Sequence, residues 1–168
     1  MSIVRNSLLV TVFVPMLACD MVGSTKPSVV ESPTDGMYAG SLTIEKRSYA
    51  AGVKVDTRSC SAPVFFNVDG AVENWFQMAE AACDLDGLTG EASVRLQTAP
   101  GATPTGSPMG TVEGSVPEMM WTGSFWSDGS FEAAGEVEVD GFGTSAEWTL
   151  TVSAMSLDAL GDSGDSGL

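Results

Sequence analysis

Carboxylates are the most numerous side chains in this sequence that could carry out chemistry. The chain has 168 residues, with 22 Asp and Glu, 7 Lys and Arg and no His, so its formal net charge is −15. Two carboxyl groups about 5–9.5 Å apart can hydrolyse a glycoside, and Glu132, Glu136 and Glu138 share one face of an expected strand. That face lies opposite the apolar side of the strand and shows no sign of a cleft. We therefore interpret it as a solvated acidic surface and expect no enzyme activity.

The missing histidine and the sign of the charge exclude other classes of site. Without His there is no Ser-His-Asp triad, and Cys60 and Cys83 alone are too few ligands for zinc. We therefore expect neither a metal nor a cofactor. The excess of acids disfavours nucleic acid, whose phosphates require Lys and Arg. All six bases after Cys19 lie at or before Arg95, whereas 11 acids follow it.

Tryptophans are the residues that most suggest binding. From Trp121 to Trp126 the residues alternate, so that Trp121 and Phe125 share one face of a strand while Trp126 shares the other with Thr and Ser. We expect Trp126 to be the exposed ring. The candidate binding surface is Trp126 together with Trp121 and Trp75, and the alternative is that these rings simply fill a core.

The N-terminus carries an export signature. Arg5 precedes an apolar run of 11 residues, 8–18, which is too short to span a bilayer. It ends Met16-Leu17-Ala18-Cys19, which resembles the lipobox of bacterial lipoproteins. The resemblance implies that residues 1–18 are a cleaved signal peptide and that Cys19 becomes a lipid-bearing, palmitate-containing membrane anchor. It also implies a location on the periplasmic face or the surface of the cell envelope, with inner versus outer membrane left open.

The resemblance also bears on the other two cysteines. If Cys19 is acylated, Cys60 and Cys83 remain as an even pair in an oxidising compartment, where we expect a disulfide. Closing that loop would contribute about 3 kcal/mol to stability.

The remaining chain divides into three parts. Residues 19–35 contain two prolines and no periodicity, which predicts a lipidated cysteine and a flexible tether, although Ser28–Val30 could form a short strand. Residues 36–155 form the expected single β-domain. Residues 156–168 repeat Gly, Asp and Ser and predict an acidic disordered tail.

Apolar and polar residues alternate strongly in four runs within 36–155. Their expected inward residues are Tyr38, Gly40, Leu42, Ile44, Leu88, Gly90, Ala92, Val94, Leu96, Phe131, Ala133, Gly135, Val137, Val139, Ala146, Trp148, Leu150, Val152 and Ala154. Weaker runs predict separate strands at 53–55, 64–68, 112–116 and 119–126, with Asp-Gly turns between several of them. Residues 71–83 fit a strand better than the alternative short helix, because their neighbours are strands.

Together these runs predict an all-β fold, an antiparallel meander of about eight or nine strands. Inward glycines relieve crowding in a strongly coiled sheet, which favours a small, lipocalin-like barrel over a β-sandwich. The body is loosely similar to uncharacterised lipoproteins built of β-strand repeats, and this similarity implies no activity. We expect a non-enzymatic, lipid-anchored envelope protein with a binding or structural role. The alternatives are a carrier of a small apolar ligand and, ranked lowest, a carboxylate-based hydrolase.

Overall fold

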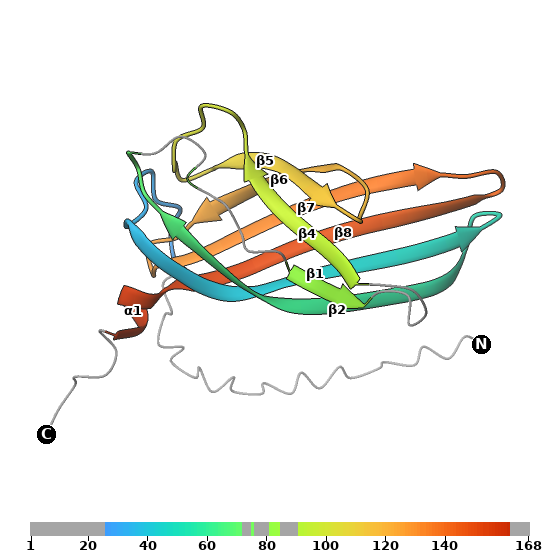
Figure 1. Ribbon diagram of the computed structural model, residues 1–168, viewed down its shortest axis with the longest axis horizontal. Coiled ribbons are helices and arrows are strands. Elements are labelled where there is room, and N and C mark those ends of the chain that lie inside the picture. The colour runs from blue at the N-terminus through green and yellow to red at the C-terminus, as the bar shows by residue number, and fades with distance from the viewer. Residues whose placement is uncertain (1–25, 72–74, 76–80, 85–90, 162–168) are drawn as a thin grey trace, which may run out of the picture.

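A computed structural model of the chain describes residues 26–71, 75, 81–84 and 91–161, with the backbone alone at 81–84 and 91–93. Eight strands and one short helix lie in these residues (Figure 1). They are β1 (Gly36–Ala50), β2 (Val53–Val68), β3 (Ala81–Asp84), β4 (Glu91–Thr98), β5 (Met109–Gly114), β6 (Met119–Phe125), β7 (Ser130–Asp140), β8 (Thr144–Ser156) and α1 (Leu157–Gly161).

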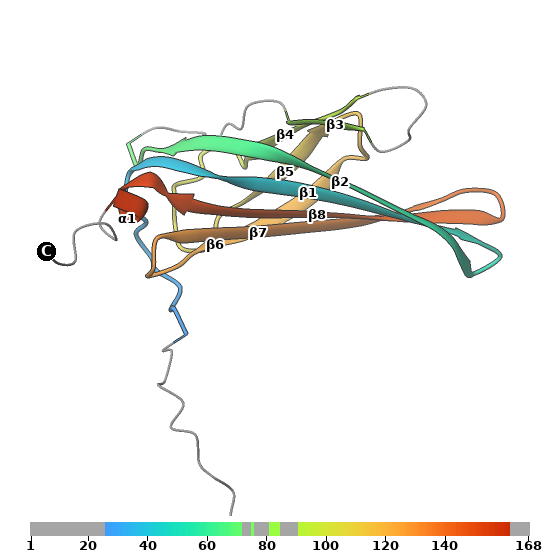
Figure 2. The same ribbon diagram turned by 90° about the horizontal axis from the view of Figure 1, so that it is seen from below.

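The strands form one antiparallel sheet in the order β2-β1-β8-β7-β6-β5-β4-β3. Strands β3 to β8 are neighbours in chain order, and β1 pairs with β8, so the order is that of an up-and-down barrel opened between β2 and β3. The sheet curls until β3 contacts β2 (Figures 1 and 2). The all-β antiparallel meander is therefore confirmed, as a curled, barrel-like sheet.

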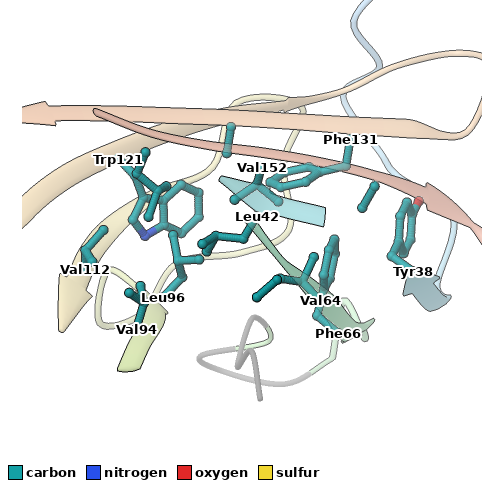
Figure 3. Packing of buried hydrophobic residues seen from close by; sticks show 14 of the residues in the cluster. Tyr38, Leu42, Val64, Phe66, Val94, Leu96, Val112, Trp121, Phe131 and Val152 are labelled. Atoms are coloured by element: carbon teal, nitrogen blue, oxygen red, sulfur yellow. The ribbon is translucent and has the colours of Figure 1, made fainter. Parts of the chain in front are cut away.

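The inner face of the curl holds the core (Figure 3). Tyr38 stacks on Phe66 with ring centroids 5.1 Å apart, and Phe131 meets Phe66 at 5.3 Å. Tyr38, Leu42 and Ile44 are buried as the alternation predicts. The expected inward residues at 88 and 90 lie outside the described residues, and the side chain at 92 is not described either.

Inward glycines make room for the largest buried side chain. Trp121 pairs with Gly110 on one side and Gly135 on the other. A Cβ at Gly110 would lie 1.7 Å from the Gln97 carbonyl oxygen and 2.8 Å from the indole ring. The indole N–H donates to the carbonyls of Gln97 and Thr111, both at 3.1 Å. The small residues thus let the sheet close tightly over the ring.

The β1–β2 and β7–β8 hairpins extend beyond the core as a four-stranded arm, residues 45–59 and 136–149 (Figure 2). None of its residues is buried. Val139 is therefore exposed, which corrects the expectation that it faces a core, whereas Trp148 is partly buried and packs against the core. The weak runs at 53–55 and 64–68 are one continuous strand, β2, rather than two.

Two terminal segments also differ from expectation. Within the expected tether, Val29 pairs with Trp126, and the N–H of Val30 donates to the Phe125 carbonyl at 2.9 Å. Residues 28–30 are therefore docked on the end of β6. Residues 157–161 of the expected disordered tail form helix α1. Within 71–83, residues 81–83 belong to β3 and Trp75 is buried, while 72–74 and 76–80 lie outside the described residues.

Candidate functional site: a groove on the outer face

The outer face of β6, β7 and β8 is hollowed into one shallow groove. Two adjoining depressions of about 390 and 420 Å³ share Thr122, Ala134 and Thr151 as their common lining. The first runs toward Trp126 and Glu132, and the second toward Met120 and Glu136. Since side chains alternate across a strand, the groove is built from the residues that face away from the core.

The side chain of Trp126 lines one end of the groove, and its backbone is held by the β6–β7 turn. The Trp126 N–H donates to the Ser130 carbonyl at 2.9 Å, and the Gly129 N–H donates to the Trp126 carbonyl at 3.0 Å. Gly129 has a φ of 82°, which is the left-handed conformation that favours glycine. On the other side, the Ser127 N–H donates to the Ser28 carbonyl at 2.8 Å. The backbone of Trp126 is therefore fixed from two directions.

A carboxylate stabilises the same turn. The hydroxyl and the N–H of Ser130 both donate to Asp128 Oδ1, at 2.6 and 3.0 Å. These hydrogen bonds, the hydroxyl's first, lower the pKa of Asp128 below its ordinary value. Asp128 also lines a smaller depression of about 150 Å³ behind Trp126, with Lys26 and Glu132. The groove thus continues to the point where the N-terminal segment reaches the sheet.

The structure separates the three tryptophans proposed as a binding surface. Trp126 lines the groove but is half-buried rather than exposed as expected. Trp121 is fully buried and Trp75 is 4% exposed, with its ring 5.5 Å from that of Phe125. Both belong to the core, so their proposed place on a surface is wrong. Trp121 points inward because it shares the inner face of β6 with Phe125. Trp75 lies inward because its ring packs beside Phe125.

The structure describes the three cysteines to different extents. Cys60 lies on β2, partly buried against the core. Cys83 lies on β3, where only the backbone is described, and Cys19 lies outside the described residues. The lipid anchor and the pairing of Cys60 with Cys83 therefore remain predictions.

The carboxylates of β7 lie on the solvated outer face, as the alternation predicts. Glu132, Glu136 and Glu138 are exposed on the outer face. Glu132 and Glu136 lie at opposite ends of the groove, four residues apart on β7, which is about 14 Å along an extended strand. Glu136 and Glu138 lie about 7 Å apart along the strand, within the range for a hydrolytic pair, but only Glu136 lines the groove. Among the described residues no three Cys, Asp or Glu side chains gather to hold a metal ion.

The interior of the curl is occupied by side chains in the part that the structure describes. Phe125 and Phe131 lie 4.7 Å apart by ring centroids, and Tyr38 lies 5.5 Å from Phe125. A carrier of a small apolar ligand needs an internal cavity. The filled core gives that alternative no support.

The groove itself was not predicted from the sequence. Its signal is the run of small polar residues at outward positions, Thr122, Ser124, Thr151 and Ser153, with Ala134 between them. Such residues are ordinary on a wet strand face. Only the pairing of β6, β7 and β8 shows that they adjoin one another beside a tryptophan.

Comparison with protein families, curated proteins and solved structures finds no match for this chain. Among the residues that the structure describes, α1 is the only helix, and nothing in them has the length and apolar character of a membrane-spanning helix.

Proposed function

We propose that the chain is a lipid-anchored protein of the bacterial cell envelope that binds a ligand through its outer groove and catalyses no reaction. The observation that carries the binding role is the groove itself, with Trp126 fixed at one end. The anchor rests on the lipobox-like sequence that ends at Cys19.

The docked N-terminal segment links the two parts of this proposal. Seven residue steps separate Cys19 from Lys26, which lines the depression behind Trp126. A fully extended chain spans at most about 3.6 Å per residue. An acylated Cys19 would therefore keep Lys26, which lies beside the Trp126 end of the groove, within about 25 Å of the membrane surface. The ligand is accordingly expected at the membrane or in the layer directly above it.

A disulfide between Cys60 and Cys83 is part of the same proposal. Cys60 lies on β2, partly buried against the core, and β2 contacts β3, the strand that holds Cys83. A bond between these strands would join the two edges of the sheet. Disulfides persist in exported proteins, so the pairing agrees with an envelope location.

Radioactive palmitate tests the anchor. Cells that make the wild-type chain should incorporate label into it, and cells that make Cys19→Ala should not. Equal labelling of the two would contradict the anchor.

Retention on isolated cell envelopes tests the binding role separately. The full chain carrying Cys19→Ala, which lacks the lipid, should sediment with added envelopes. A further Trp126→Ala change should weaken this retention roughly tenfold or more, because buried aromatic anchors dominate binding energies. Phe142→Ala is the matched control, since Phe142 is a fully exposed aromatic at the tip of the arm. Equal retention of all three chains would contradict a binding role for the groove.

A further inference from the structure

The lining of the groove has a distinct chemical character. Its floor and walls are mostly apolar surface interspersed with Ser and Thr hydroxyls, its two ends carry Glu132 and Glu136, and one end presents the Trp126 ring. Neither of the two larger depressions has Lys or Arg in its lining. A phosphate or carboxylate ligand would need such a cation to replace its hydration. Lys26 lines only the smaller depression behind Trp126, together with Asp128 and Glu132, so the two larger depressions disfavour anionic ligands.

We propose that this groove binds a neutral polysaccharide chain. This inference rests on the proposed binding role and names its ligand class. A sugar ring has an apolar face of C–H groups, which stacks on an indole, and a rim of hydroxyls. Serine and threonine hydroxyls can both donate to and accept from such a rim. Glu132 beside Trp126 is a strong acceptor for sugar hydroxyls at the end where the ring stacks.

The shape of the groove agrees with a chain rather than a single small molecule. It crosses three outward rows of the sheet, from Ser124 through Thr122 to Met120. Two steps of two residues span about 14 Å along a strand. The groove is open along the outer face, so a polymer can pass over it without threading.

The indole N–H of Trp126 adds an independent observation. It is buried from solvent and has no hydrogen-bond partner. Buried donors are nearly always paired in folded proteins, and an unpaired one calls for an explanation. The side chain at this end of the groove therefore holds one polar atom that the protein itself does not satisfy.

Tryptophan fluorescence can test the inference on the full chain, held in a detergent without a sugar headgroup. The probes are two neutral tetrasaccharides, one of β-1,4-linked glucose and one of β-1,4-linked N-acetylglucosamine. At least one should give a saturating change in emission in the micromolar to millimolar range. Trp126→Ala should abolish the change, whereas Phe142→Ala should leave it intact.

A second pair of variants separates hydroxyl contacts from folding. Thr151→Val keeps the shape of the groove and removes a hydroxyl, and should weaken binding several-fold. Thr57→Val makes the same change on an exposed residue of the arm, outside the groove, and should have no effect. Equal affinities for these two variants would contradict recognition by the groove hydroxyls.

The outcomes also distinguish this inference from the function on which it rests. Absence of any saturating response to either sugar overturns the polysaccharide proposal. If Trp126→Ala still weakens retention on envelopes in that case, the groove binds another class of ligand and the binding role stands. If retention is independent of Trp126 as well, both proposals fall.

Discussion

Close backbone approach at single residues sets how this sheet curls. Gly110 lies opposite Trp121. Because Gly110 has no side chain, the Gln97 carbonyl and the indole can both approach its Cα closely. A methyl group there would collide mainly with backbone, which cannot move aside as a flexible side chain can. Position 110 therefore requires a glycine.

Gly110→Ala should therefore destabilise the protein by about 3 kcal/mol or more, at the upper end of the overpacking range. Urea unfolding followed by far-ultraviolet circular dichroism measures the change. Gly161→Ala is the control, because an added Cβ there meets nothing within 4 Å, and it should change stability by less than about 0.5 kcal/mol. Similar midpoints for the two variants would show that the sheet relaxes around Gly110.

Asp128 gives a prediction about pH. Its pKa is lowered in the folded protein by the Ser130 hydroxyl and N–H, whereas the unfolded value is about 3.9. The folded state therefore binds fewer protons than the unfolded chain as pH falls toward and below that value, and stability is lost there. The contribution of the charged Asp128 is fully present above about pH 5.

Asp128→Asn should accordingly be less stable than wild type at neutral pH, and the difference should shrink as pH falls through the folded pKa. Thermal unfolding between neutral and strongly acidic pH measures it. Ser130→Ala keeps Asp128 but removes the hydroxyl that donates to it. The free energy of unfolding of this variant should therefore depend less on pH than that of wild type. A constant difference at every pH would rule out the charge as its cause.

At the scale of the strands, alternation predicted most of the sheet. Tyr38, Leu42, Val94 and Leu150 lie inward as expected because one face of each strand packs on a core. The same rule failed at Val139, since periodicity reports which residues share a face and not whether another layer covers that face. The groove was not predicted for a related reason. The residues that line it come from three strands, and the sequence does not show in which register those strands pair.

The arm predicts unequal protection along one pair of strands. Leu42 pairs with Val152 in the body, and both are buried, whereas Ser48 pairs with Ala146 in the arm, where neither is. Backbone hydrogen bonds without buried side chains around them open locally at low free-energy cost. Amide protons of residues 46–50 should therefore exchange at least about tenfold faster than those of residues 40–44.

Native-state hydrogen exchange, resolved by residue, measures this contrast. The ion pair of Arg47 with Glu147, 3.2 Å apart and partly exposed, lies within the arm. Arg47→Ala should increase exchange only slightly, since exposed ion pairs contribute little. Equal protection in the arm and the body would contradict local opening of the arm.

At the scale of the molecule, the open seam is the feature that separates this sheet from a closed barrel. The first and last strands, β1 and β8, are hydrogen-bonded to each other, whereas β2 and β3 are the two edges of the sheet. Edge strands expose backbone groups that invite pairing with other chains. Sequence alternation cannot show where such a seam falls, because it does not specify which strands pair.

The proposed bond between Cys60 and Cys83 would fasten this seam, and its loss should act on the two edges first. Closing a loop of 23 residue steps limits the unfolded chain and stabilises the protein by about 3 kcal/mol. Cys60→Ser and Cys83→Ser should each cost about that amount, and the double variant should cost no more than the larger single change, because either one breaks the same bond. Urea unfolding of the oxidised chain gives these values, and thiol counting on denatured, unreduced protein should find no free Cys60 or Cys83. Additive losses, or two free thiols in the exported protein, would show that the edges are held without a disulfide.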